Sequence, residues 1–127
     1  MSGMSARPAE DVIPVLRAAG ARFAMVFGSQ ARGDAREGSD VDIAAYFGSD
    51  APQAFDVLVP SGVDLLVLDG APLELSGRVA MEGTVLFEDD REARIEWVAR
   101  TRKIYSDERY RFERSHREFA EAVLARG

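Results

Sequence analysis

The sequence predicts an α+β fold in which a small mixed sheet is flanked by helices. Three observations favour it. Short apolar runs bounded by turn formers indicate four strands, helical patterns separate only some of them, and the last third of the chain is charged and helical. Regular βαβ alternation is therefore absent. The 127 residues fit one domain, with a core over about 8–90 and a helical segment over 91–127.

The first part of the chain is predicted to hold one helix and two strands. Apolar residues recur at helical spacing over 12–19, and Gly20 is a suitable C-terminal stop. Pro14 fits best in a first helical turn, where its missing N–H is harmless, so we expect this helix to begin later than its apolar pattern suggests. Strands are expected at 22–27 and 41–47.

The remainder is predicted to alternate short strands with helices before a long helical end. The expected elements are a helical turn within 49–60, a strand over 63–68, a helix over 72–81 and a strand over 84–87. From Asp90 the sequence is charged and helical. Ser106-Asp107 is interpreted as a joint that caps a second helical stretch, and Trp97 is expected in the core because it shares helical spacing with apolar neighbours.

Composition excludes several classes of protein. The net charge is −6, whereas proteins that grip a nucleic-acid backbone usually carry a basic surplus, so a polynucleotide is not expected as the main substrate. The absence of cysteine excludes disulfides and thiolate metal sites. No apolar run approaches the ~18 residues of a membrane helix. The first ten residues have no hydrophobic signal core, so we expect a cytoplasmic protein without membrane contact.

Two motifs at strand ends suggest a site for phosphate and metal. Gly28-Ser29 ends the first strand, and such a turn can hold phosphate through free N–H groups and the serine hydroxyl. Asp40 and Asp42 head the second strand and, being two residues apart, point the same way. Paired carboxylates repel unless a cation lies between them, and oxygen-only ligands favour Mg²⁺ or Mn²⁺. Each motif alone also fits an ordinary turn or a solvated strand edge.

A third acidic residue, Asp64, is the one charge within the apolar run of residues 63–68. Buried charge is costly without a partner. If this strand lies beside that of Asp40 and Asp42, the three carboxylates form one cluster. The alternative is an aspartate that caps a loop at the mouth of the strand.

Together these residues resemble a known family. Gly28-Ser29, ten intervening residues and then Asp40-Val41-Asp42 match the signature of the DNA polymerase β-like nucleotidyltransferases. Residues 28–33 and 39–42 further resemble the minimal nucleotidyltransferase (MNT) subgroup, which includes the antitoxins of HEPN–MNT toxin–antitoxin systems. The resemblance implies the polymerase β-like fold and transfer of a nucleoside monophosphate from a triphosphate.

The resemblance also implies roles for individual residues. Asp40, Asp42 and Asp64 are the implied catalytic ligands of two Mg²⁺ ions, with Mn²⁺ as an alternative, and Asp64 also helps to deprotonate the acceptor. The implied nucleotide-binding residues are Gly28, Ser29, Arg32 and Ser39. Arg32 suits the departing pyrophosphate because its planar guanidinium matches phosphate. It can equally form a surface ion pair with a nearby carboxylate.

For the donor and acceptor, the resemblance implies transfer of AMP from ATP to a tyrosine hydroxyl of a cognate HEPN ribonuclease toxin, which neutralises that toxin. Two other hypotheses stay open. The chain can act as a non-catalytic antitoxin that binds and masks its partner, with residues 91–127 as the contact surface. It can also nucleotidylate a small molecule, although the second domain that usually supplies such an acceptor pocket is missing from the sequence.

Overall fold

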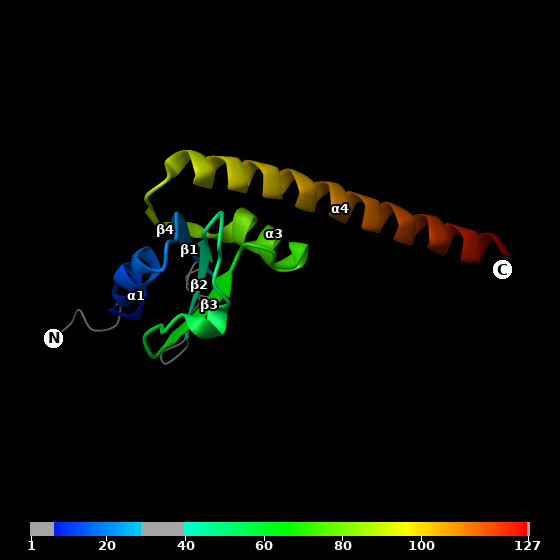
Figure 1. Cartoon of the computed structure of the whole chain (residues 1–127). Coiled ribbons are helices and arrows are strands. Elements are labelled where there is room, and N and C mark those ends of the chain that lie inside the picture. Colours follow the sequence, from blue (N-terminus) through cyan, green and yellow to red (C-terminus); the bar gives the residue numbers. More distant parts are fainter. Residues whose placement is uncertain (1–6, 29–39, 127) are drawn as a thin grey trace.

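The computed structural model describes residues 7–28 and 40–126 (Figure 1). In chain order the elements are α1 (Arg7–Ala18), β1 (Phe23–Phe27), β2 (Val41–Tyr46), the 3-10 helix η2 (Ala54–Asp56), β3 (Val63–Val67), α3 (Leu73–Glu82), β4 (Thr84–Glu88) and α4 (Arg91–Arg126). All four strands and the turn before the third strand are where the sequence predicts them. Among the described residues, no helix combines the length and the apolarity needed to cross a membrane.

The four strands form one mixed sheet in the order β3-β2-β1-β4. β1 is antiparallel to both of its neighbours, whereas β2 and β3 are parallel. A parallel pair needs a long crossover connection, and the segment over 47–62, which contains η2, supplies it. This arrangement confirms the predicted α+β class with a mixed sheet.

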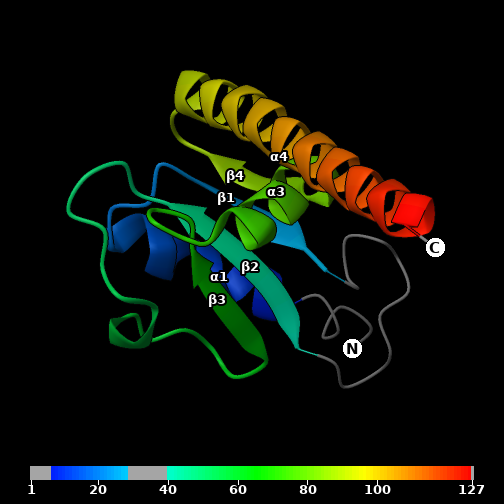
Figure 2. The same ribbon diagram turned by 90° about the vertical axis from the view of Figure 1, so that its right-hand side faces the viewer.

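Helices cover the two faces of the sheet in separate layers (Figure 2). α1 lies on one face, where Val12 and Leu16 are fully buried against side chains such as Ile43. α3 and the first half of α4 lie on the other, where Val79 and Trp97 pack around Phe23. Because side chains alternate along a strand, β2 contributes to both layers. Val41, Ile43 and Ala45 face α1, and Asp42, Ala44 and Tyr46 face α3 and α4.

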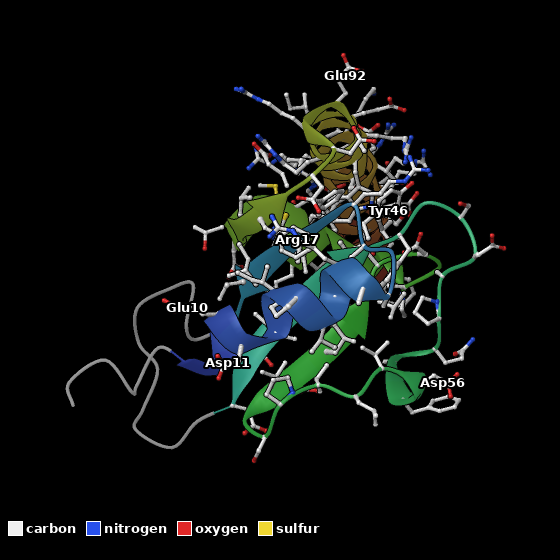
Figure 3. All side chains as sticks on the ribbon, turned by 60° about the vertical axis from the view of Figure 1, so that its left-hand side comes forward. Glu10, Asp11, Arg17, Tyr46, Asp56 and Glu92 are labelled. Carbon is white, nitrogen blue, oxygen red and sulfur yellow. The ribbon has the colours of Figure 1, made fainter. Side chains whose placement is uncertain are left out.

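The prediction that the first helix begins after its apolar pattern starts is wrong. α1 already begins at Arg7 and contains Pro14 in its interior. Pro14 has no N–H to donate to the carbonyl of Glu10. It is exposed, however, and the burial of Val12 and Leu16 on either side of it stabilises the helix. Figure 3 shows Arg17 near the end of α1. Its guanidinium pairs with Asp89, beyond β4, at an N–O distance of 2.9 Å.

The predicted joint at Ser106-Asp107 is also wrong, because α4 is one helix from Arg91 to Arg126. Neither glycine nor proline occurs between its ends. An ion pair from Lys103 to Asp107, with an N–O distance of 3.2 Å, bridges the expected break. Such pairs one turn apart support a helix. Asp90 caps its start by accepting a hydrogen bond from the Ala93 N–H at 3.0 Å.

Candidate active site

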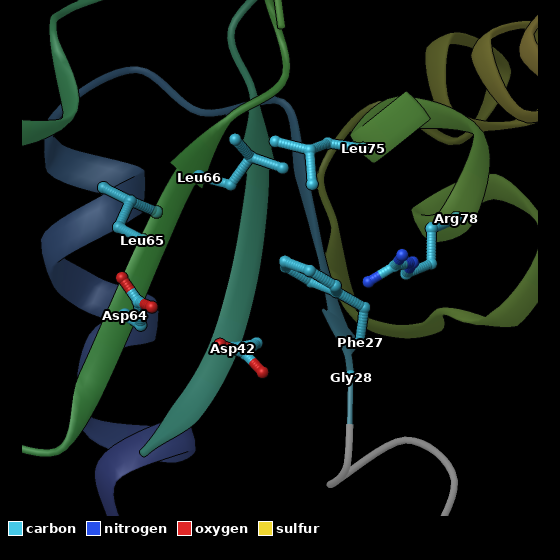
Figure 4. Close-up of a pocket in the computed structure, with 8 residues that line it drawn as sticks. All are labelled: Phe27, Gly28, Asp42, Asp64, Leu65, Leu66, Leu75 and Arg78. Carbon is cyan, nitrogen blue, oxygen red and sulfur yellow. The ribbon is translucent and has the colours of Figure 1, made fainter. Parts of the chain in front are cut away.

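Asp42 and Asp64 lie side by side at one end of the sheet (Figure 4). The two residues are direct partners in the parallel β2–β3 ladder, so their side chains project from the same face. Both line a cavity of about 480 Å³ together with residues from β1, β3 and α3. The complete lining is Phe27, Gly28, Asp42, Asp64, Leu65, Leu66, Leu75 and Arg78. The sheet thus brings together two of the three predicted carboxylates.

Asp40 occupies a different position. It is exposed, precedes the first residue of β2, and does not line the cavity. The ladder with β3 starts only at Val41, whose partner is Val63. Within 7–28 and 40–126, no three acidic, histidine or cysteine side chains are grouped closely enough to hold a metal ion. The expected three-carboxylate group is therefore not gathered in this structure, which is consistent with the mutual repulsion of like charges.

Gly28 is held against Asp42. Its backbone has a left-handed φ of 74°, a conformation that favours glycine. A Cβ at this position would overlap the carboxylate of Asp42 and lie 3.2 Å from its Cγ. The turn after β1 can therefore approach this carboxylate only because residue 28 has no side chain.

Three other predicted nucleotide-binding residues, Ser29, Arg32 and Ser39, lie outside the described residues. Their roles remain those that the family resemblance implies. Gly28 is the part of that turn that can be placed beside the cavity.

Arg78 is a residue of the cavity that the sequence analysis missed. It projects from α3 towards the space beside Phe27 and Gly28 (Figure 4). Within the part of the chain that the structure describes, its guanidinium has no ion-pair or hydrogen-bond partner. A signal was present, because Arg78 follows Leu75 by three residues and so shares a face of the predicted helix.

The chemistry of the cavity is divided between its walls. Two carboxylates lie at one side, a guanidinium faces the space from α3, and Phe27, Leu66 and Leu75 supply apolar surface. The volume is within the range of small-molecule sites. Carboxylate oxygens fit a hard cation such as Mg²⁺, and arginine suits phosphate. The types of side chain in the cavity are therefore those that suit a nucleotide bound together with a divalent cation.

Comparison with known proteins identifies the family. The family model described as "Polymerase beta, Nucleotidyltransferase" matches residues 10–92, a range that contains every strand of the sheet and both cavity carboxylates. The chain belongs to this family. It is a nucleotidyltransferase, as its sequence signature predicted.

Solved structures share its fold. A chain from a toxin–antitoxin structure with AMP-PNP has a TM-score of 0.64 at 21% identity, covering 91% of this chain and 98% of the other. A structure of tri-AMPylated Shewanella oneidensis HEPN toxin in complex with MNT antitoxin gives 0.61 at 19%, covering 95% and 99%. An MntA–HepT toxin–antitoxin structure gives 0.58 at 19%, covering 92% and 97%. No curated protein gives a significant match.

Proposed function

We propose that this protein transfers AMP from ATP to a tyrosine hydroxyl of a cognate HEPN ribonuclease and so acts as its antitoxin in the cytoplasm. The observation that carries the proposal is the in-register pair of Asp42 and Asp64 facing a nucleotide-sized cavity. The likeness to chains from toxin–antitoxin complexes over almost their whole length supports the choice of acceptor, as does the AMPylated toxin in one of them.

In the proposed reaction, Asp42 and Asp64 would hold Mg²⁺ at the cavity, and Asp40, which does not line the cavity in this structure, would complete the ligand set for two ions, with Mn²⁺ as an alternative. When bound, these ions neutralise phosphate charge and lower the pKa of the attacking hydroxyl. Asp64 takes the hydroxyl proton, and the tyrosine oxygen forms a bond to the α-phosphorus. The bond from that phosphorus to the β-phosphate bridging oxygen breaks, and pyrophosphate leaves with the electron pair.

Other residues hold the donor. Gly28 and Ser29 hold the β- and γ-phosphates, Ser39 also binds the nucleotide, and Arg32 offsets charge on the departing pyrophosphate. We add Arg78 as a ligand of the phosphate chain, because its guanidinium faces the cavity and has no partner among residues 7–28 and 40–126. The apolar wall of Phe27, Leu66 and Leu75 suits the nucleoside.

The direct test mixes the purified protein, the product of the adjacent open reading frame, ATP and Mg²⁺, and then weighs the acceptor by mass spectrometry. We expect added mass in units of AMP on a tyrosine. Asp64→Asn should abolish the modification. Its matched control is Asp56→Asn, at an exposed aspartate on η2, which should leave the modification unchanged. An unmodified acceptor with the wild-type protein would contradict the proposal.

A second candidate is neutralisation by binding alone, and the exposed apolar side chains of α4 favour it. The double change Asp40→Ala with Asp42→Ala separates the two functions. If this variant still protects cells from the partner as well as the wild type does, masking rather than AMP transfer explains the antitoxin effect.

A further inference from the structure

The second half of α4 extends away from the rest of the protein (Figure 1). The first half is anchored, with Trp97 and Thr101 buried and Tyr105 half-buried. From 106 to 125 every residue is exposed. Among them are large apolar side chains, and Phe112 and Phe119 are each 70% exposed. A helix that was solvated on all sides would gain nothing from such residues.

These apolar residues continue the face by which α4 packs on α3. Tyr105 lies against Gly77 of α3, where a Cβ would overlap its ring. Residues that follow Tyr105 at alternate spacings of four and three lie on the same side of the helix. The residues reached are Arg109, Phe112, His116, Phe119 and Val123. The face is thus covered by α3 at one end and has no cover among the described residues at the other.

A groove marks the place where this cover ends. It has a volume of about 560 Å³ and lies between the start of α3 and the middle of α4. Its lining combines an apolar base with charged sides, and consists of Leu73, Glu74, Tyr105, Glu108, Arg109, Phe112 and Glu113. One helix contributes to both sites, because α3 presents Leu73 and Glu74 to the groove and Leu75 and Arg78 to the cavity.

The charge of the groove favours a basic partner. Three glutamates and one arginine line it. Two of the glutamates are already paired, Glu113 with Arg109 at an N–O distance of 3.8 Å and Glu108 with Arg111, outside the lining, at 2.6 Å. Glu74 has no ion-pair partner within the described residues. This carboxylate beside the apolar base fits a segment with apolar side chains flanked by Lys or Arg.

We infer that the groove and the exposed face of α4 dock an amphipathic helix of the protein acceptor, with basic residues beside its apolar face. A helix is the occupant that the i, i+3, i+4 spacing of the apolar residues accommodates. Docking there holds the acceptor next to the catalytic cavity, on the α3 side. The inference rests on the proposed function, since it supplies the binding site for the protein that receives AMP.

The test compares binding and AMP transfer in full-length variants, using the product of the adjacent open reading frame as probe. Phe112→Ser combined with Phe119→Ser should weaken the complex at least ~10-fold, because exposed aromatic anchors dominate such interfaces. AMP transfer at acceptor concentrations below saturation should fall by the same factor, with ATP affinity unchanged. Tyr110→Ser is the matched control, since Tyr110 is a 61% exposed aromatic residue on another side of α4. It should change binding less than ~2-fold.

Each outcome is decisive for one of the two proposals. If the double variant binds and modifies the probe like the wild type, the docking surface is wrong while the transfer activity stands. If the complex depends on Phe112 and Phe119 but no AMP is transferred, docking stands and the proposed reaction is wrong. If the wild type is a dimer in solution that the double variant breaks, with partner binding unchanged, a second copy of this chain occupies the face and the inference fails.

Discussion

Gly28 and Asp42 lie close together in the lining of the cavity proposed as the active site. The left-handed backbone of Gly28 and its close approach to the Asp42 carboxylate leave no space for a Cβ. Residue 28 therefore sets the position of a proposed metal ligand as well as the shape of the phosphate turn. We therefore expect a methyl group at residue 28 to affect the rate of AMP transfer more than the stability of the fold.

We expect Gly28→Ala to lower the free energy of unfolding by about 1–2 kcal/mol, the cost of a left-handed backbone for a residue with a Cβ. AMP transfer should fall ~10- to 100-fold because the Asp42 carboxylate is displaced. Gly70→Ala is the matched control, with a φ of 79° and no atom within 4 Å of the added Cβ. It should lose similar stability in urea titrations and keep its transfer rate. Equal transfer rates in both variants would refute this role of Gly28.

The proposed contact between Arg78 and phosphate can be tested by comparing the affinities for ATP and for uncharged adenosine. We expect Arg78→Gln to raise the Kd for ATP about tenfold or more, since a hydrogen bond to a charged group contributes roughly 1.5–3 kcal/mol. Binding of adenosine should not change, and Arg78→Lys should be intermediate because lysine lacks the planar guanidinium. Isothermal titration calorimetry measures all three. If adenosine and ATP lose affinity equally, Arg78 contacts the nucleoside rather than the phosphates.

At the scale of elements, the contact between α3 and α4 determines where Arg78 and the proposed docking face lie. Gly77 of α3 lets the Tyr105 ring approach closely. Next to it, the Arg102 Nε donates a hydrogen bond to the Ala80 carbonyl at 2.6 Å. Trp97 packs on Phe23 of β1 with ring centroids 5.9 Å apart. Together these contacts fix α4 across the helical layer before it leaves the domain.

The tight α3–α4 contact leads to a prediction about Gly77. Gly77→Ala should destabilise the protein by about 1–3 kcal/mol, because overpacking forces the Tyr105 ring to move. Tyr105→Ala in the same chain should remove most of that additional cost, giving a coupling that a double-mutant cycle in urea measures. Additive effects of the two substitutions would show that Gly77 and Tyr105 are independent.

At the scale of the whole molecule, the proposed cation site joins strands that are remote in sequence, so ligand binding should stabilise the entire fold. Mg²⁺ with a non-hydrolysable ATP analogue at a hundredfold excess over Kd should add about 2.7 kcal/mol to the free energy of unfolding. A rise in Tm by differential scanning calorimetry checks this. EDTA or Asp64→Asn should remove the rise, whereas Asp56→Asn should keep it. A rise that persists in EDTA would argue against a divalent cation in the site.

The sequence by itself determined the class of the fold, the strands and the family to which the chain belongs. Alternation of apolar residues and turn formers is local, so β1 to β4 could be placed without tertiary information. The spacing from Gly28-Ser29 to Asp40 and Asp42 identified the family for the same reason. It also predicted Asp64, although only the parallel pairing of β2 with β3 brings Asp64 beside Asp42.

Only the tertiary structure decided which other groups surround these carboxylates. Arg78 and Leu75 enter the cavity because α3 packs against the sheet, a long-range contact that helical periodicity alone leaves open. The sequence also did not predict that α4 continues beyond Ser106 or that a groove lies beside α3. A potential cap and an unbroken helix have the same local sequence pattern, and tertiary packing with ion pairs one turn apart decides between them.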